Sequence, residues 1–167
     1  AENTLTITMA TRSSLEGFYK TSIIISGLTG SGTVGANVKI PLDPADTPFG
    51  PYCRWYHETG TIILKVINEE GTVAGETYVL SFGLRNGPKM QMARDVTIRA
   101  DYQNYRDILY NGPWISQTLM TNDVNLRAPL LIAGFDIIEM EQSSATVGTI
   151  NQISLNISTS LDVNVTL

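Results

Sequence analysis

Apolar and polar residues alternate with a period of two along much of this chain. Residues 4–10 place leucine, isoleucine and methionine in one phase and mostly threonine in the other, and residues 77–84 and 95–101 repeat the pattern. This period is typical of half-buried β-strands, in which successive side chains point to opposite faces. Two further runs, residues 21–28 and 61–67, carry apolar residues in both phases, which indicates strands covered on both faces.

Turn signals separate these runs. Asn86-Gly87-Pro88 and Asn111-Gly112-Pro113 combine residues that tolerate positive φ with a proline that ends a ladder. The four prolines in residues 41–51 predict an extended surface loop, and Glu69-Glu70-Gly71 predicts a hairpin tip between the strand-like runs on either side. No segment has a convincing helical period. Seven or more short strands predict an all-β fold, an antiparallel β-sandwich of Ig-like or jelly-roll/Greek-key type.

The composition excludes several classes of protein. With 11 Lys and Arg against 16 Asp and Glu among 167 residues, the formal net charge is −5, which argues against nonspecific binding to nucleic acid or to an anionic membrane surface. No apolar run is long enough to span a bilayer. The single cysteine rules out an internal disulfide and a zinc site built on paired cysteines. No secretory leader is visible at residue 1, so we expect a mature form or a piece of a longer chain.

The last segment of the chain has a long, strict alternation. We expect a sandwich domain over residues 1–141 and an extended C-terminal strand over residues 142–167, which links to or completes the neighbouring unit. Left unpaired in water, such a strand is an aggregation hazard, so it must pair with its own domain or with a neighbour's. From residue 151 on, the apolar residues of this expected assembly strand all occupy odd positions: Ile153, Leu155, Ile157, Leu161, Val163, Val165 and Leu167.

The two ends of the chain resemble each other. Residues 3–11 align with residues 151–159 at an offset of 148, from Asn3 to Asn151, and the apolar positions of the two segments coincide. One interpretation is that all half-buried strands look alike. The other is a repeat with this period, in which the C-terminal segment is the first strand of the next unit.

Two N-glycosylation sequons lie in the same segment. They are Asn156-Ile157-Ser158 and Asn164-Val165-Thr166. Both asparagines occupy even positions and so belong to the polar phase of the strand, where an attached glycan would reach solvent. We therefore predict Asn156 and Asn164 as glycosylation sites in a secreted protein.

No motif in the sequence supports catalysis. Gly30 to Gly35 matches the dinucleotide pattern G-x-G-x-x-G, but the prolines that follow exclude the helix that would hold a pyrophosphate. Cys53 and His57 are close in sequence without an identifiable orienting partner, so a structural role is the favoured interpretation. We predict no catalytic residue, no metal site and no cofactor. Several tyrosines and both tryptophans could instead form a platform for stacking sugars, or fill a core or an interface.

Several stretches carry strand and turn motifs that resemble those of a known family: residues 3–8, 23–31, 59–66, 78–88 and 142–159. Through these motifs the chain is similar to the roughly 150-residue β-sandwich repeats of large secreted surface and fibril glycoproteins of algae and other protists. The resemblance implies an extracellular or cell-surface location, glycosylation and a repetitive structural role, and it supplies no catalytic residues.

The sequence thus favours a non-enzymatic, extracellular structural protein. Copies of the unit, or adjacent repeats, would form a head-to-tail fibre by β-strand complementation, decorated with N-glycans. The partners are then copies of itself, without nucleic acid and without a membrane span. Two alternatives remain open at this stage: a lectin-like carbohydrate-binding sandwich, and a viral capsid or pilus-type structural subunit.

Overall fold

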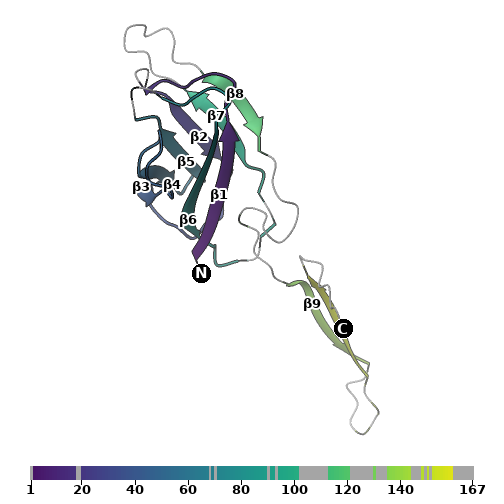
Figure 1. The fold of residues 1–167 in the computed structure, drawn as a ribbon. Helices are drawn as coiled ribbons and strands as arrows, with labels where there is room; N and C mark the ends of the chain where they lie inside the picture. The colour runs from purple at the N-terminus through teal and green to yellow at the C-terminus, as the bar shows by residue number, and fades with distance from the viewer. Residues whose placement is uncertain are drawn as a thin grey trace.

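A computed structural model of the chain shows an all-β protein (Figure 1). Its described residues form ten strands and no α-helix, which confirms the fold class predicted from the alternation. All strand pairs are antiparallel. The structure describes residues 2–17, 20–67, 69, 71–89, 91–92, 94–101, 113–120, 130, 135–143, 148, 150 and 152–159.

Six of the strands form one large sheet. Its spatial order is β3-β4-β5-β2-β7-β8, so the two edges of this sheet are β3 and β8. The bounds of these strands are β2 (Ser22–Ser26), β3 (Ala36–Pro41), β4 (Tyr52–Tyr56), β5 (Thr61–Lys65), β7 (Thr97–Asp101) and β8 (Pro113–Leu119).

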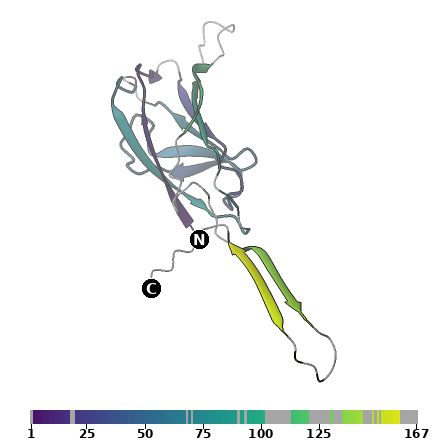
Figure 2. The same cartoon turned by 90° about the vertical axis from the view of Figure 1, so that its right-hand side faces the viewer.

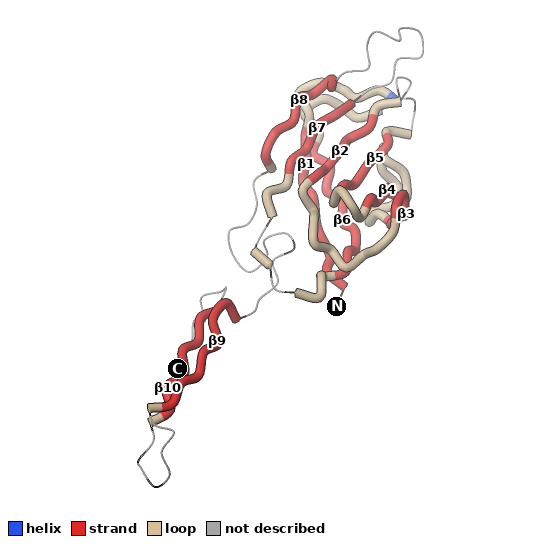
Figure 3. The backbone as a smooth tube through the Cα atoms, turned by 180° about the vertical axis from the view of Figure 1, so that it is seen from behind, coloured by secondary structure: helices blue, strands red, loops and turns tan. Residues whose placement is uncertain are grey.

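A much smaller sheet packs on one face of the large one. It consists of β1 (Glu2–Ala10) and β6 (Thr77–Arg85), paired in continuous register from Glu2 opposite Arg85 to Ala10 opposite Thr77. Figures 1 and 3 show that β6 lies toward the β3 side of the large sheet and β1 toward the β7–β8 side. Two strands thus face six, and the second layer of the sandwich is narrow.

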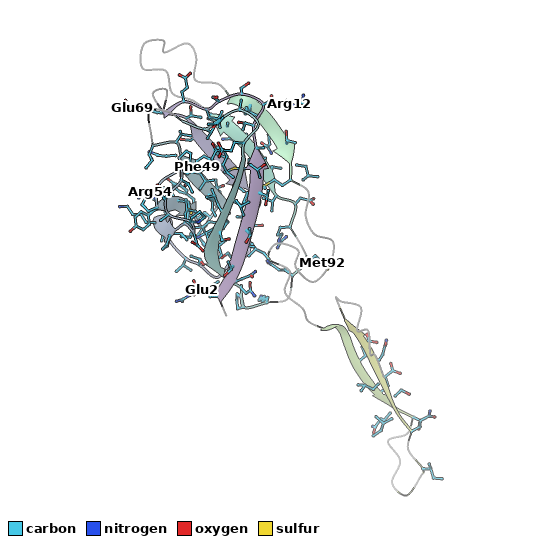
Figure 4. All side chains as sticks on the ribbon, viewed as in Figure 1. Glu2, Arg12, Phe49, Arg54, Glu69 and Met92 are labelled. Carbon is cyan, nitrogen blue, oxygen red and sulfur yellow. The ribbon has the colours of Figure 1, made fainter. Side chains whose placement is uncertain are left out.

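The core lies between these two layers. Side chains from the inward phase of β6, among them Leu80 and Phe82, are buried against the large sheet. Trp55 on β4 is the largest fully buried side chain, and its indole N–H donates to the Thr33 carbonyl at 2.8 Å. Phe49 packs edge-on against Tyr78 with ring centroids 5.7 Å apart, and Figure 4 shows Phe49 within the sandwich. These contacts account for a single core made by residues from both sheets.

The connection from β5 to β6 corrects one expectation. Glu69-Glu70-Gly71 does not cap a hairpin, because β5 belongs to the large sheet and β6 to the small one. The chain crosses between layers here and is held by Thr72, whose N–H donates to the Leu15 carbonyl and whose hydroxyl accepts from the Leu15 N–H, both at 2.9 Å. Two consecutive alternating runs can pair with each other or with other strands, and their pattern is the same in both cases.

The last two strands form a separate hairpin. β9 (Phe135–Gln142) pairs with β10 (Ile153–Thr159) and with no other strand among the described residues. Figures 1 and 2 show this β9–β10 hairpin extending away from the sandwich. The sequence placed residues 135–141 in the sandwich domain and left open whether the C-terminal strand pairs with its own domain or with a neighbour's. In the structure β9 is the hydrogen-bonding partner of β10.

Candidate assembly site

Cys53 does not form a nucleophilic site. It lies on β4 with its side chain fully buried, and its Sγ contacts the Ile40 carbonyl at 3.6 Å. Desolvation by burial raises the pKa of the Cys53 thiol to about 11. The thiol is therefore protonated and shielded at neutral pH. His57 sits in the turn after β4, where its backbone N–H donates to the Gly35 carbonyl at 3.1 Å.

The raised pKa of Cys53 predicts a specific loss of stability in alkali. The pKa of Cys53 is about 11 in the folded protein against an ordinary value of 9.0. The contribution of the thiol to the free energy of unfolding is therefore present in full below pH 9 and is lost as the pH rises through 11. Between pH 9 and pH 11, the difference in unfolding free energy between wild type and Cys53→Ala should fall by about 2–3 kcal/mol, at about 1.4 kcal/mol per pKa unit. Urea unfolding of both proteins across this range measures it. A difference that stays constant with pH would contradict the prediction.

The Gly30–Gly35 loop is a structural clamp and leads into a strand, β3, rather than into a helix. The Gly32 N–H and the Ser31 hydroxyl both donate to the Arg85 carbonyl, at 2.8 and 2.9 Å, and the Arg85 N–H donates to the Thr33 hydroxyl at 2.7 Å. The loop thus covers the last residues of β6. It has the geometry of a loop that protects a sheet edge, not that of a phosphate-binding loop.

The outer edge of β6 is covered at a second point. Asp43 and Ser81 exchange two backbone hydrogen bonds, at 2.9 and 2.8 Å, in an isolated antiparallel bridge. Together with the clamp at Arg85, this bridge occupies the side of β6 that faces away from β1. The small sheet is therefore closed on its β6 side.

The outer edge of β1 is open by comparison. Within the described residues, β1 pairs only with β6, and no backbone hydrogen bond of a neighbouring segment reaches its other side. The strand is nine residues long, with no bulge and no proline. Leu5 and Met9 point toward the core and are partly buried, as is Tyr78, the β6 partner of Met9. Ile7 and its partner Leu80 are buried, and so is Phe82, the partner of Leu5. The core is thus less completely covered at Leu5 and Met9 than at Ile7.

The edges of the large sheet carry features that discourage pairing. β3 contains a bulge at Asn37, whose φ is +58°, and ends at Pro41. β8 begins at Pro113, and its pairing with β7 has two register shifts. Bulges and prolines are the devices by which natural sheets block edge-to-edge contact. Among the described residues, the outer edge of β1 is thus longer and more regular than the outer edges of β3 and β8.

The β9–β10 hairpin has one apolar and one polar face. Ile153 and Leu155 stand in the same phase and are 66% and 60% exposed, and the Cα partner of Leu155 on β9 is Met140. On the other face the Asn156 side-chain amide donates to a Glu139 carboxylate oxygen at 3.4 Å. An apolar hairpin face in water is destabilising, so this face is a candidate contact surface.

The structure places the predicted site residues as follows. Ile153 and Leu155 are exposed on β10, and Ile157 lies on the same strand opposite Ile138. Asn156 is exposed on the polar face, as the sequon interpretation requires. The remaining predicted positions lie outside the described residues: Leu161, Val163, Asn164, Val165 and Leu167.

The sequence did not identify β9 as the partner of β10, although a signal for a break in pairing was present. Apolar residues change phase between Ile137 and Ile138, which suggested a bulge or a strand passing between sheets. The observed register shifts nearby, between Ser158 and Thr159, opposite Ile137 and Phe135. The open edge of β1 was also missed, because alternation describes faces and not edges.

The aromatic residues do not gather into a sugar-stacking platform on β4. Trp55 is fully buried, so its ring is unavailable to a ligand. Tyr52 is half-exposed, and the Lys39 ammonium lies 5.6 Å from its ring centroid. Tyr102, Tyr105 and Tyr110 lie outside the described residues, and the side chain of Trp114 is not described. Tyr56 is partly buried on the same face of β4 as Tyr52, and its hydroxyl donates to the Asn37 Oδ1 at 3.3 Å. The observed part of the predicted platform is therefore one core residue, Trp55, and two residues on the opposite face of β4, Tyr52 and Tyr56.

Among the described residues, no three His, Cys, Asp or Glu side chains gather closely enough to hold a metal ion. No helix found there combines the length and apolar character needed to cross a membrane. Compared with known proteins, the chain matches no protein-family model, no curated protein and no solved structure.

Proposed function

We propose that this protein is an extracellular structural protein, the unit of a head-to-tail fibre assembled by β-strand complementation. The observation that carries the proposal is the β9–β10 hairpin, which extends from the sandwich with Ile153 and Leu155 exposed (Figure 2). The donor segment is this hairpin rather than a lone strand. A neighbouring copy, or the adjacent repeat of a longer chain, is its partner.

The hairpin has a physical reason to bind something. An isolated two-stranded hairpin is marginally stable in water, and independent stability needs further strands or a packing surface. Burying Ile153 and Leu155 would contribute about 1.5–3 kcal/mol for each side chain. Main-chain hydrogen bonds along an unpaired edge would add specificity of register. Both gains are absent while the hairpin stands alone.

The two surfaces involved are different, which determines the form of the assembly. The hairpin extends from one end of the molecule (Figure 1), whereas the partly buried core residues Leu5 and Met9 belong to β1 of the sandwich. A contact between two unlike surfaces leaves one free surface at each end of every complex. Such heterologous contacts propagate into filaments unless the rotation closes a ring.

Glycosylation is compatible with this contact. Asn156 is exposed on the polar face of the hairpin, opposite in phase to Leu155. A glycan on Asn156 would therefore project away from an apolar contact on the other face. The sequons and the resemblance to secreted surface repeats support an extracellular location for the proposed fibre.

Imaging and sedimentation of the full chain test the proposal. We expect monomers in dilute solution and filaments or a ladder of oligomers as concentration rises, because association is governed by mass action. Negative-stain electron microscopy distinguishes filaments from closed rings or amorphous aggregate. A chain that remains monomeric at all soluble concentrations, glycosylated or not, would contradict a self-assembling function.

A further inference from the structure

The open edge of β1 and the open edge of β10 fit each other in the phase of their backbone groups. We infer that the intact β9–β10 hairpin of one copy adds through β10 to the outer edge of β1 in the next copy, with β10 running parallel to β1. The inference rests on the proposed self-assembly and specifies its acceptor, its direction and its register. It commits to a second copy of this unit as the occupant of the β1 edge.

Backbone hydrogen bonds identify the residues of β1 that face its open edge. Ser81 exchanges two backbone hydrogen bonds with Asp43, so the N–H and C=O of Ser81 point away from β1. Thr6 is the β1 partner of Ser81, and two directly opposite residues of an antiparallel pair either both face each other or both face away. The N–H and C=O of Thr6 therefore point to the open edge. The same holds for Thr4 and Thr8, and all three threonine side chains are exposed.

The hairpin has the opposite phase at its open edge. The Ser143 N–H donates to the Gln152 carbonyl at 2.9 Å, so the backbone groups of Gln152 face β9. Because these groups alternate in direction along a strand, those of Asn156 also face β9, and those of Ile153 and Leu155 point to the outer edge of β10. The open edge of β1 thus presents the backbone groups of polar residues, whereas the open edge of β10 presents those of apolar residues.

This difference in phase determines the direction of pairing. In an antiparallel pair, residues whose backbone groups bond to each other lie directly opposite and place their side chains on one face, whereas in a parallel pair each residue bonds to the two neighbours of the residue opposite it. Antiparallel addition would therefore turn Leu155 to the outer face and Asn156 toward the core, where its amide would be desolvated. Parallel addition places Leu155 on the inward face and Asn156 on the outer face with the threonines of β1.

One register brings every apolar residue of β10 beside an apolar residue of β1. It is the register of the 148-residue offset, with these neighbours: Ile153 and Leu5, Leu155 and Ile7, Ile157 and Met9. A shift by two residues in either direction would place an apolar residue of β10 beside Asn3 or Thr11. In the inferred register the Leu155 N–H would donate to the Thr6 carbonyl, and the Leu155 carbonyl would accept from the Thr8 N–H.

The addition widens the narrow layer of the sandwich without displacing β6 or opening the hairpin. The small sheet would have the order β6-β1-β10-β9, and Met140, the β9 partner of Leu155, would lie on the same inward face. β1 lies toward the β7–β8 side of the large sheet, where Ile98 and Ile115 are only partly buried (Figures 1 and 3). The added strands would therefore extend the layer on the side of these partly buried side chains.

β10 suits this edge better than β9, the other outer strand of the hairpin. Only two apolar side chains of β9, Ile138 and Met140, share the phase of its outward-facing backbone groups, against three on β10. β9 also carries three acidic residues, whereas β10 is uncharged, and the one charged residue of β1 is Glu2. Addition through β10 thus brings no like charge to β1. Neither β1 nor β10 has a lysine or a proline, the residues that block strand addition.

Cysteine cross-linking in the full chain tests both the direction and the register. One tagged copy carries Ser154→Cys or Asn156→Cys on β10. A differently tagged copy carries Thr4→Cys, Thr6→Cys or Thr8→Cys on β1. The two copies are mixed under assembling conditions, and the thiols are oxidised or bridged with a short cross-linker. All five side chains are exposed in the structure, and the native cysteine is buried and adds no background in the folded protein.

We expect Asn156→Cys to cross-link best to Thr8→Cys, and Ser154→Cys to Thr6→Cys. For Asn156→Cys, the early yield of mixed dimer should be at least ~10-fold higher with Thr8→Cys than with Thr4→Cys, because four residues span about 13 Å along the edge and disulfides need closely apposed β-carbons. The best partner on β1 thus moves toward the C-terminal end of β1 when the cysteine on β10 does. Only a parallel arrangement gives this result.

Other outcomes overturn the inference and leave self-assembly standing. Oligomers in which the best partner moves toward Thr4 as the cysteine moves from Ser154 to Asn156 contain an antiparallel contact. Stronger cross-linking of the β1 cysteines to Glu139→Cys than to either β10 position would show that β9 docks instead. Oligomers with equal yields at all three β1 positions exclude the β1 edge as the acceptor. Absence of both oligomers and cross-links contradicts the inference together with the proposed function.

Discussion

Leu155→Lys should abolish assembly while leaving the sandwich folded. Leu155 is 60% exposed on the apolar face of the hairpin and is not one of the side chains of the sandwich core. The substitution removes about 1.5–3 kcal/mol of burial at the contact and places a charge in it. Loss of the apolar contribution alone corresponds to a contact weaker by about 10- to 100-fold, and the buried charge weakens it further. Sedimentation velocity across a concentration series measures the effect.

Asn156→Lys is the matched control for this substitution. It introduces the same charge one residue along the same strand, but on the polar face beside Glu139. We expect assembly within a few-fold of wild type and an unchanged thermal melt for both variants. Equal loss of assembly in the two variants would attribute the effect to charge alone. Normal assembly of Leu155→Lys would remove the apolar face from the mechanism.

Trp55→Ala should cost the sandwich about 3–5 kcal/mol of unfolding free energy. The side chain is fully buried on β4, and its indole N–H satisfies the Thr33 carbonyl at 2.8 Å. Alanine leaves a cavity and a carbonyl without its donor, and the two effects add. Since a domain of this size is stable by only about 5–15 kcal/mol, the variant should be close to unfolding at physiological temperature. Urea titration followed by far-ultraviolet circular dichroism measures the change.

Tyr52→Ala is the control on the same strand. Tyr52 is half-exposed, and its ring contacts the Lys39 ammonium at the surface. We expect a loss of about 1 kcal/mol or less, since exposed cation–π contacts are weak. Trp55→Phe, which keeps most of the volume and loses the N–H donor, should fall between the two. Equal small losses of unfolding free energy for all three variants would show that burial of Trp55 contributes little to the stability of the core.

The sequence located strands well where polar and apolar residues alternate or where β-branched residues cluster. β2, β5 and β7 lie within the predicted runs, and β1 and β6 overlap theirs, with β1 beginning earlier at Glu2 and β6 ending later at Arg85. β4 was missed although it alternates, with Cys53 and Trp55 buried and Tyr52, Arg54 and Tyr56 on the outer face, because an aromatic residue such as tyrosine can belong to either face and hides the contrast. β3 was missed because its only strongly buried side chain is Ile40, and Pro41 ends it. Periodicity thus identifies strands whose outward residues are clearly polar.

The candidate site could be predicted in part. The apolar phase of β10 and the exposure of Asn156 follow from even and odd positions, and the structure has Ile153 and Leu155 exposed. The pairing of β10 with β9 could not be read in this way. Strand partners are chosen by tertiary context, and one alternating strand is compatible with many neighbours. The open edge of β1 is likewise a property of topology, visible only once β6 is known to take the other edge.

Hydrogen exchange at low and high protein concentration tests the central claim most directly. In the monomer, alternate amides of residues 2–10 point to the unpaired edge of β1 and should exchange rapidly, while those bonded to β6 are protected. Under assembling conditions we predict that the rapid β1 amides become protected, together with those on the open edge of the β9–β10 hairpin. Filaments that form while these amides continue to exchange at the monomer rate would contradict strand complementation at β1.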